Sequence, residues 1–205
     1  ADTWAPIGAY TPFSGVFYGN GHKISSTKLF QSTAMSGIFG QNAGTIKDLD
    51  VNVTIIDVAT NTGTLCATNT GRIENCHAEG SITTNENKNI GGLVGYNNGG
   101  VIYNCGADVV ITAPNSTVGG LVGYNQNATV KNSYASNDDE DSVIAGNVVG
   151  GLVGYAYNDN SNVRSLISNC YSLSKIAGGS KTGGLIGQAN VYAGRGYIQV
   201  EYSYA

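Results

Sequence analysis

The chain repeats itself, and this repeat constrains the fold more than any other feature of the sequence. A phrase of the form Gly-Gly-Leu-(Val or Ile)-Gly occurs four times, and two less regular copies precede it. The Leu or Ile of the six copies falls at positions 38, 65, 93, 121, 152 and 185, which gives spacings of 27, 28, 28, 31 and 33 residues. A second phrase, related to Ile-(any)-Asn-Cys, follows each copy and begins at Ile46, Ile73, Ile102, Val130, Ile167 and Val200.

Each repeat unit contains short strand-like segments separated by turns. A third, looser segment follows the second phrase, as in Val51–Ile55 and Val109–Thr112, and no unit has a helical stripe. The chain has 30 Gly and 23 Asn among 205 residues, and both residue types are poor in helix interiors. One unit of about 28 residues with three strands cannot bury its own apolar face, but stacked units can. The repeat therefore predicts an all-β, parallel β-solenoid of about six coils.

In such a solenoid, equivalent residues of successive coils lie above one another at a spacing of about 4.8 Å. The six Leu or Ile residues of the first phrase should form one inward column, and the six Ile or Val residues of the second phrase another. Small residues should form a third column, and the Gly residues should lie where the backbone turns sharply or approaches the next coil. The Asn residues after the first phrase should either adopt a left-handed conformation or hydrogen-bond between coils; they are Asn42, Asn69, Asn97 and Asn125.

The first phrase resembles the GLUG motif, which is named for its Gly-Leu-(any)-Gly core. The close matches are Gly92–Gly95, Gly120–Gly123, Gly151–Gly154 and Gly184–Gly187, and the lead-in Phe13–Ile24 also looks like one that precedes such repeats. The resemblance implies a right-handed parallel β-helix in an adhesin-like bacterial surface or secreted protein. GLUG regions also accompany immunoglobulin A peptidases, which are zinc enzymes with a His-Glu-x-x-His motif. This chain has only two His residues and no such motif, so the peptidase activity is not carried over.

We expect residues 1–35 to form an N-terminal cap and first coil, and residues 36–205 to form the continuous repeat array. The chain opens without a signal peptide, which fits a processed secreted protein or a trimmed one. Its last stretch still alternates as a strand at Tyr197, Tyr202 and Tyr204. Two interpretations of that end stay open: the chain is a fragment of a longer protein, or the end stacks on the start of another subunit and forms a head-to-tail filament.

Two groups of side chains are candidates for ligand binding. Tyr96, Tyr124 and Tyr155 directly follow the first phrase and should form a surface ladder that either stabilises the coils or contacts a sugar or a protein. Asp138, Asp139, Glu140 and Asp141 fall in an insertion and carry oxygen ligands that suit Ca²⁺, although they lack the spacing of a calcium loop. Apart from this weak calcium candidate, we expect no cofactor.

Three of the four cysteines share one predicted column with Leu49, Ser133 and Ser203. That placement favours small buried core residues, and it leaves open a disulfide between Cys76 and Cys105, which should lie on adjacent coils. Cys170 lies two coils beyond Cys105 and should stay unpaired, the state of Cys66 stays open, and the spacings do not match a zinc finger.

The charge pattern excludes some partners. Lys and Arg total 10 against 14 Asp and Glu, without a basic block, so a nucleic-acid partner is not expected. No apolar run reaches the length of a membrane span. The residues Asp48, Glu74, Lys47 and Lys131 form only a thin constellation for catalysis, and we expect no enzymatic activity.

The sequence therefore favours a non-enzymatic module of a bacterial cell-surface or secreted protein. It would serve as a scaffold or adhesion module that contacts a host protein, a glycan or copies of itself. Two alternatives stay open. One is a carbohydrate-binding or polysaccharide-cleaving β-helix, and the other is an ice-binding solenoid that uses a loosely aligned row of Thr54, Thr83 and Thr112.

Overall fold

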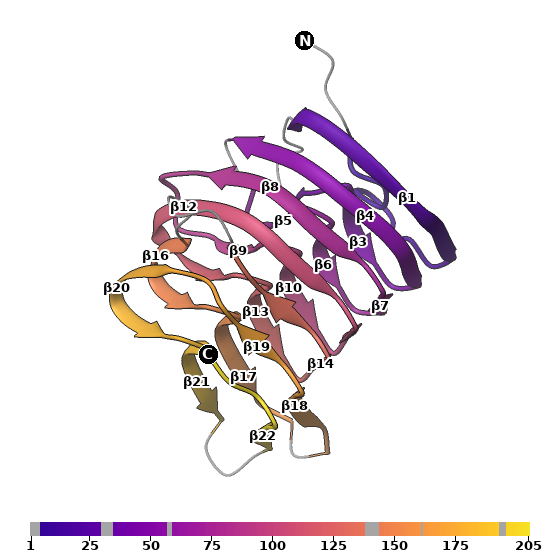
Figure 1. Ribbon diagram of the computed structural model, residues 1–205. Helices are drawn as coiled ribbons and strands as arrows, with labels where there is room; N and C mark the ends of the chain where they lie inside the picture. The colour runs from indigo at the N-terminus through magenta and orange to yellow at the C-terminus, as the bar shows by residue number, and fades with distance from the viewer. Residues whose placement is uncertain (1–4, 30–34, 57–58, 138–143, 161, 193–195) are drawn as a thin grey trace.

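The computed structural model describes residues 5–29, 35–56, 59–137, 144–160, 162–192 and 196–205, and these ranges contain strands and turns without a helix. Successive coils stack along one axis, from the N-terminal coil in indigo to the C-terminal coil in yellow (Figure 1). Every pairing between named strands is parallel. The predicted all-β solenoid of about six coils is confirmed.

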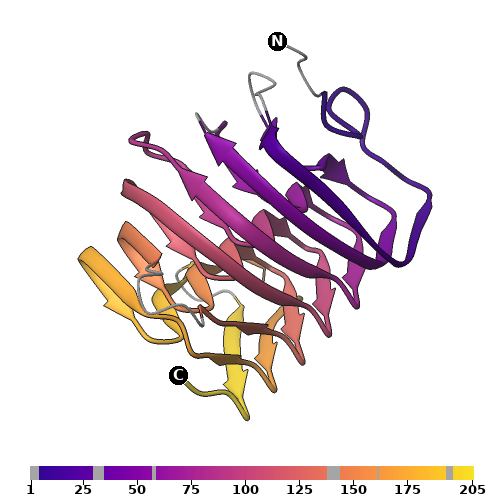
Figure 2. The ribbon, with the colours of Figure 1, turned by 45° about the horizontal axis from the view of Figure 1, so that its top comes forward.

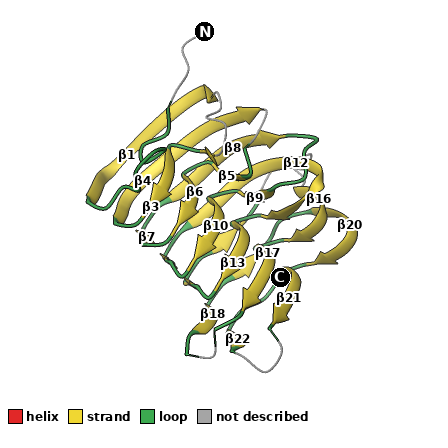
Figure 3. Cartoon of the chain, turned by 180° about the vertical axis from the view of Figure 1, so that it is seen from behind, coloured by secondary structure: helices red, strands yellow, loops and turns green. Residues whose placement is uncertain are grey.

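One sheet of six strands forms the first face of the stack, and Figure 3 shows its strands one after another from behind. Its strands are β3 (Phe39–Asn42), β6 (Cys66–Asn69), β10 (Val94–Asn98), β13 (Val122–Gln126), β17 (Val153–Asn158) and β21 (Ile186–Val191). After a short turn the chain enters a second face. Its strands are β1 (Val16–Leu29), β4 (Thr45–Ile56), β7 (Arg72–Glu74), β11 (Val101–Tyr103), β14 (Thr129–Lys131), β18 (Arg164–Ser168) and β22 (Tyr197–Glu201).

A third face follows at a sharp corner. It contains the second halves of β1 and β4, then β8 (His77–Thr83), β12 (Gly106–Gly119), β15 (Tyr134–Ala135), β16 (Ile144–Gly150), β19 (Tyr171–Ser172) and β20 (Ile176–Gly183). Each coil also has a fourth, very short segment that the sequence analysis missed. It comprises β2 (Met35–Ser36), β5 (Asn61–Gly63), β9 (Asn89–Gly91) and the ends of β12, β16 and β20. The tilted view in Figure 2 shows how these layers repeat along the stack.

The core consists of columns of like residues. Ile102 pairs with Ile73 on one side and with Val130 on the other, as predicted for the second phrase. The Leu column is buried from Ile38 to Leu152, and its last member, Leu185, is partly buried at the C-terminal end. The small-residue column is also in register, with Ala107 between Ala78 and Ala135. At the N-terminal end, the rings of Phe13 and Phe17 pack on Phe39 at centroid distances of 5.6 and 5.3 Å.

The glycines of the first phrase lie where two layers of backbone come too close for a side chain. A Cβ atom on Gly123 would lie 2.6 Å from the backbone nitrogen of Ile90 and 2.7 Å from the carbonyl oxygen of Gly95. A Cβ atom on Gly120 would overlap the carbonyl oxygen of Gly151 in the next coil. The predicted close approach is confirmed, and it explains why glycine recurs at these positions in the later coils, whereas the second coil has Ala67 in the place of Gly95.

The structure distinguishes the two roles that were open for the Asn residues. Asn42, Asn69, Asn97 and Asn125 form a buried ladder, in which the Nδ2 of each residue donates to the Oδ1 of the next at 2.8, 2.9 and 2.8 Å. The left-handed conformation belongs to a different column at the corner between the second and third faces. There φ lies between 49° and 56°, at Asn20, Asp48, Asn75, Asn104, Asn132, Asn169 and Tyr202.

The predicted Thr row is wrong at one position. Thr83 pairs with Thr112, but it lies opposite Ile56 on its other side, and Thr54 instead pairs with Ser81. Val51 pairs with Ala78, and Thr54 follows Val51 by three residues, whereas Thr83 follows Ala78 by five. Thr54 therefore lies two residues away from the row. A flat Thr row across three coils, which the ice-binding alternative required, is therefore absent at this position.

The cysteine column is in the predicted place. The backbone N–H of Cys105 donates to the hydroxyl of Ser133, and that of Cys170 donates to Ser203, each at 3.1 Å. All four cysteines are buried and unpaired, so the open disulfide between Cys76 and Cys105 is not formed.

Candidate functional site

The three tyrosines proposed as a binding surface do form a ladder on the outer side of the first face. Tyr96 pairs with Tyr124, and Tyr124 pairs with Tyr155, through strands β10, β13 and β17. The ring centroids are 5.1 and 4.9 Å apart, with interplanar angles of 30° and 32°. The three side chains are half-buried. The ladder follows directly from the parallel register, which places equivalent residues one strand spacing apart. We call it the tyrosine ladder.

The ring spacing limits how the tyrosine ladder can contact a ligand. Rings about 5 Å apart cannot lie side by side on the surface, and instead they stack, so the faces of Tyr124 are directed at Tyr96 and Tyr155. In the middle of the ladder, the ring edge and the hydroxyl group face the solvent. This geometry favours the structural role of the ladder over a flat platform for sugar rings, and its ligand-binding role stays a prediction.

Sequence reasoning missed three residues that complete this cluster. Tyr157 lies two residues after Tyr155 on β17, and its ring is 6.4 Å from that of Tyr124 at an interplanar angle of 16°. Gln126 accepts a hydrogen bond of 2.6 Å from the Tyr96 hydroxyl and donates to Asp159 at 3.0 Å. Asp159 comes from the insertion of the fifth coil, so no repeat position marked it as part of the surface.

The cluster shifts the titration of its phenols. Burial, together with the neighbouring phenols and Asp159, raises the pKa of Tyr124 far above its usual value. Burial and Asp159 also raise the pKa of Tyr96 and Tyr157. Like ordinary phenols, these hydroxyl groups are protonated at neutral pH and act as hydrogen-bond donors as well as acceptors, and the raised pKa keeps them protonated to a higher pH.

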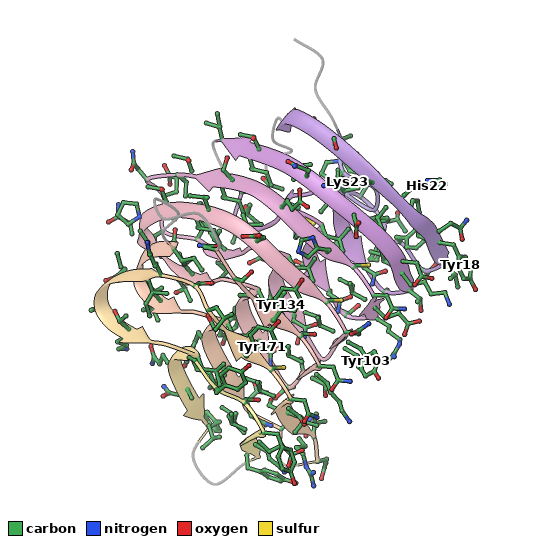
Figure 4. The ribbon with its side chains drawn as sticks, in the orientation of Figure 1. Tyr18, His22, Lys23, Tyr103, Tyr134 and Tyr171 are labelled. Atoms are coloured by element: carbon green, nitrogen blue, oxygen red, sulfur yellow. The ribbon has the colours of Figure 1, made fainter. Side chains whose placement is uncertain are left out.

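A second aromatic column runs down the third face. The rings of Tyr134 and Tyr171 stack at 5.2 Å with an interplanar angle of 7°, and those of Tyr171 and Tyr204 stack at 5.5 Å and 11°. Figure 4 shows Tyr134 and Tyr171 one above the other on the side that faces the viewer. His77 extends the column, with its ring 6.1 Å from that of Tyr134.

The residues predicted to mark an assembly end are all exposed. Tyr197, Tyr202 and Tyr204 are 47, 81 and 59% exposed, and Val200 beside them is 45% exposed although its column is fully buried in the preceding coil at Ile167. The edges of β20, β21 and β22 have no strand beyond them among the described residues. At the opposite end, residues 7 and 13 bridge to β3 and cover the edge of the first face.

The other candidate residues do not gather into a reactive centre. Asp138, Asp139, Glu140 and Asp141 lie outside the described residues, and the described ranges contain no group of three His, Cys, Asp or Glu residues placed to hold a metal ion. Of the candidate catalytic carboxylates, Glu74 is paired with Arg72 and lies 3.8 Å from Lys47. Asp48 accepts a hydrogen bond of 2.9 Å from Asn75.

These observations define a class of protein, a parallel β-solenoid built from short glycine-rich repeats. The family model for the GLUG motif matches residues 86–112, 114–139 and 145–177, so the chain carries GLUG repeats and the predicted resemblance is confirmed. Among the described residues, no helix has the length and apolar character to cross a membrane.

Two known proteins share parts of this architecture. Halomucin of Haloquadratum walsbyi (strain DSM 16790 / HBSQ001) is 38% identical over 87 residues, which is 40% of this chain and 1% of Halomucin. A solved structure of IgA1 Protease matches with a TM-score of 0.65 and 20% identity, over 97% of this chain and 16% of the other. The second likeness shows the fold alone. The chain thus spans a small fraction of both proteins.

Proposed function

We propose that this chain is a non-enzymatic, rigid module of a cell-surface or secreted bacterial protein, and that it acts as a structural scaffold that holds other parts of that protein at a distance. The proposal depends on one observation, the continuity of the interior. Columns of Leu, Ile and small residues run from coil to coil without interruption. Such a continuous, close-packed interior resists bending.

The polar groups of the interior support the same function. Among the described residues, the hydroxyl of Ser174 is the one buried side-chain polar group without a hydrogen-bond partner. The Asn ladder satisfies its amides internally, and the thiol of Cys105 donates to the carbonyl of Tyr103 at 3.3 Å. Polar atoms in this core are therefore used for stability rather than directed at a ligand.

The comparisons support the surface location. Halomucin is a far longer chain that contains a stretch similar to 40% of this one, and the GLUG model matches three segments here. A stack of coils suits this setting because its length increases by about 4.8 Å with each coil, without a new fold.

The enzymatic alternative is tested by a digestion screen. The purified chain is incubated with a panel of polysaccharides and peptides, and new reducing ends or new amino groups are measured. We expect no release. Release that disappears in the variant Glu74→Gln, but persists in the control Glu86→Gln, would overturn the proposal, because Glu74 is the best-placed carboxylate of the candidate catalytic group.

Self-assembly is a second candidate function, favoured by the exposed edge at β20 to β22. The apolar side chains at this edge continue buried columns, and the edge of β22 has Glu201 as its one charged residue. A head-to-tail contact would pair this edge with β1, but residues 7 and 13 already cover β3 at the other end. Light scattering over a range of concentrations tests this candidate: a strict monomer rejects it, and a mass that grows without limit supports a filament.

A further inference from the structure

Two of the buried cysteines lie next to each other on adjacent coils. Cys76 directly precedes β8 and Cys105 directly precedes β12, and the first residues of these strands, His77 and Gly106, pair with each other. The backbone N–H of Gly106 also donates to the carbonyl of Cys76 at 3.0 Å. The two cysteines are therefore equivalent residues of the second and third coils, one strand spacing of about 4.8 Å apart.

The residues that precede the two cysteines form the same corner in both coils. Asn75 and Asn104 have φ angles of 52° and 53°, and the Nδ2 of Asn104 donates to the Oδ1 of Asn75 at 2.8 Å. The chain is thus in register on both sides of Cys76 and Cys105, which fixes the two residues opposite each other. Both are buried, with 2 and 1% of their surface exposed.

The two thiol groups have the same orientation. The Sγ of Cys76 donates to the carbonyl of Glu74 at 3.2 Å, and the Sγ of Cys105 donates to the carbonyl of Tyr103 at 3.3 Å. In each case the acceptor is the residue two positions earlier, so the side chains lie parallel. A disulfide requires Cα atoms about 4.4–6.8 Å apart and side chains that do not point away from each other. This pair meets both conditions, and rotation of the side chains would close the bond.

The other two cysteines have no such neighbour. Cys170 has Ser133 on one side and Ser203 on the other, and Ser133 separates it from Cys105. The distance from Cys170 to Cys105 is therefore two strand spacings, about 9.6 Å, which exceeds the reach of a disulfide. Cys66 lies on β6, in the six-stranded sheet of the first face. Geometry thus selects one pair among the four cysteines.

We propose that Cys76 and Cys105 are a disulfide site, which is closed by a disulfide oxidant such as oxidised glutathione and then fastens the second coil to the third. The structure shows the thiol form. One cysteine thiolate attacks oxidised glutathione, which forms a mixed disulfide and releases one glutathione. The other cysteine attacks the protein sulfur of this mixed disulfide and releases the second glutathione. Two protein thiols are oxidised, one glutathione disulfide is reduced, and the two thiol protons end on the released glutathiones.

Burial determines when this bond can form. It raises the pKa of the Cys105 thiol well above its usual value, and the adjacent Cys76 thiol contributes to the rise. Because the thiolate is the reacting species, the folded chain should react slowly with oxidised glutathione. A chain that is still folding exposes both sulfur atoms. We therefore expect the bond to form during folding in an oxidising compartment. The proposal is independent of the scaffold function.

Refolding in a glutathione redox buffer tests the proposal. The chain is unfolded in urea with a reductant, transferred to a buffer of reduced and oxidised glutathione, alkylated and digested, and its cysteines are assigned by mass spectrometry. We expect a linked peptide pair that joins Cys76 to Cys105, with Cys66 and Cys170 alkylated. The urea midpoint of the oxidised chain should exceed that of the reduced chain by about 1 M, because the cross-link constrains the unfolded chain.

Two serine variants provide a matched control. Cys170→Ser should keep the link and the shift in the urea midpoint, whereas Cys105→Ser should lose both. Serine already occupies this column at Ser133 and Ser203, so both variants should fold. If Cys105→Ser fails to fold, the assignment in the original chain still decides.

Three outcomes would overturn the proposal. They are free Cys76 and Cys105 in a refolded chain with the circular dichroism of the native one, a link that joins either of them to another cysteine, and an oxidised chain that is less stable than the reduced one. None of these outcomes bears on whether the module is a rigid scaffold.

Discussion

The buried Asn ladder yields the sharpest prediction about stability, through the substitution Asn97→Ala. Asn97 is fully buried, donates through Nδ2 to Asn125 at 2.8 Å and accepts from Asn69 at 2.9 Å. The substitution removes both bonds at once. It leaves the Oδ1 of Asn125 without its donor, whereas the Nδ2 of Asn69 keeps a longer contact of 3.3 Å with a backbone carbonyl.

The expected loss in the free energy of unfolding follows from the two hydrogen-bond partners that the substitution leaves behind, Asn69 and Asn125. A buried polar group that loses its partner costs about 1–3 kcal/mol, and one of the two partners here is partly compensated. We therefore expect Asn97→Ala to lower the free energy of unfolding by about 2–4 kcal/mol. The substitution Asn98→Ala is the matched control, because the neighbouring Asn98 is exposed and lies outside the ladder.

Urea unfolding followed by circular dichroism measures both variants. The control should lie within about 0.5 kcal/mol of the original chain, as is usual for surface substitutions. If Asn97→Ala costs no more than Asn98→Ala, the ladder is not a source of stability and the reasoning is refuted.

Three further predictions concern the core and the tyrosine ladder. The variant Gly123→Ala should lose more than about 2 kcal/mol of stability in the same urea assay, because its Cβ would meet backbone atoms on two sides; an unchanged midpoint would contradict the close approach. Burial raises the pKa of the Cys66 thiol to about 12, so a thiol reagent at mildly alkaline pH should label it only after unfolding, and rapid labelling of the folded chain would be contrary to the structure. The folded-state pKa of Tyr124 lies above the unfolded value of about 10, so its contribution to stability should be complete below that pH and decline above it. In Tyr124→Phe this decline should be smaller, and identical pH profiles for the two chains would refute the assignment.

The columns of the core could be predicted from the sequence because they repeat. Leu121, Ile102 and Ala107 each have counterparts in neighbouring units, and in a parallel stack with a fixed register such counterparts must meet. The fourth segment of each coil escaped prediction because it contains a single buried apolar residue, such as Ile90 in β9, between Asn and Gly. That pattern is too short to show a strand period.

The corner and the surface cluster escaped prediction for different reasons. The left-handed corner had a visible signal, since Asn75 and Asn104 recur in the second phrase, and Asn is the residue type that tolerates this conformation. Asp159 had no such signal, because it occurs once, in an insertion, and joins Gln126 only when the coil is folded. Repeats therefore reveal the interior of a solenoid better than they reveal what its surface binds.

The central claim is that equivalent residues of successive units lie directly above one another. Nuclear Overhauser contacts between methyl groups of Leu93, Leu121 and Leu152, in a sample labelled at Leu methyls, test it most directly. The structure predicts contacts from Leu121 to both of the others, and none between Leu93 and Leu152, which are two strand spacings apart. Contacts that skip a unit, or Leu121 methyls without either neighbour, would contradict the stacked solenoid.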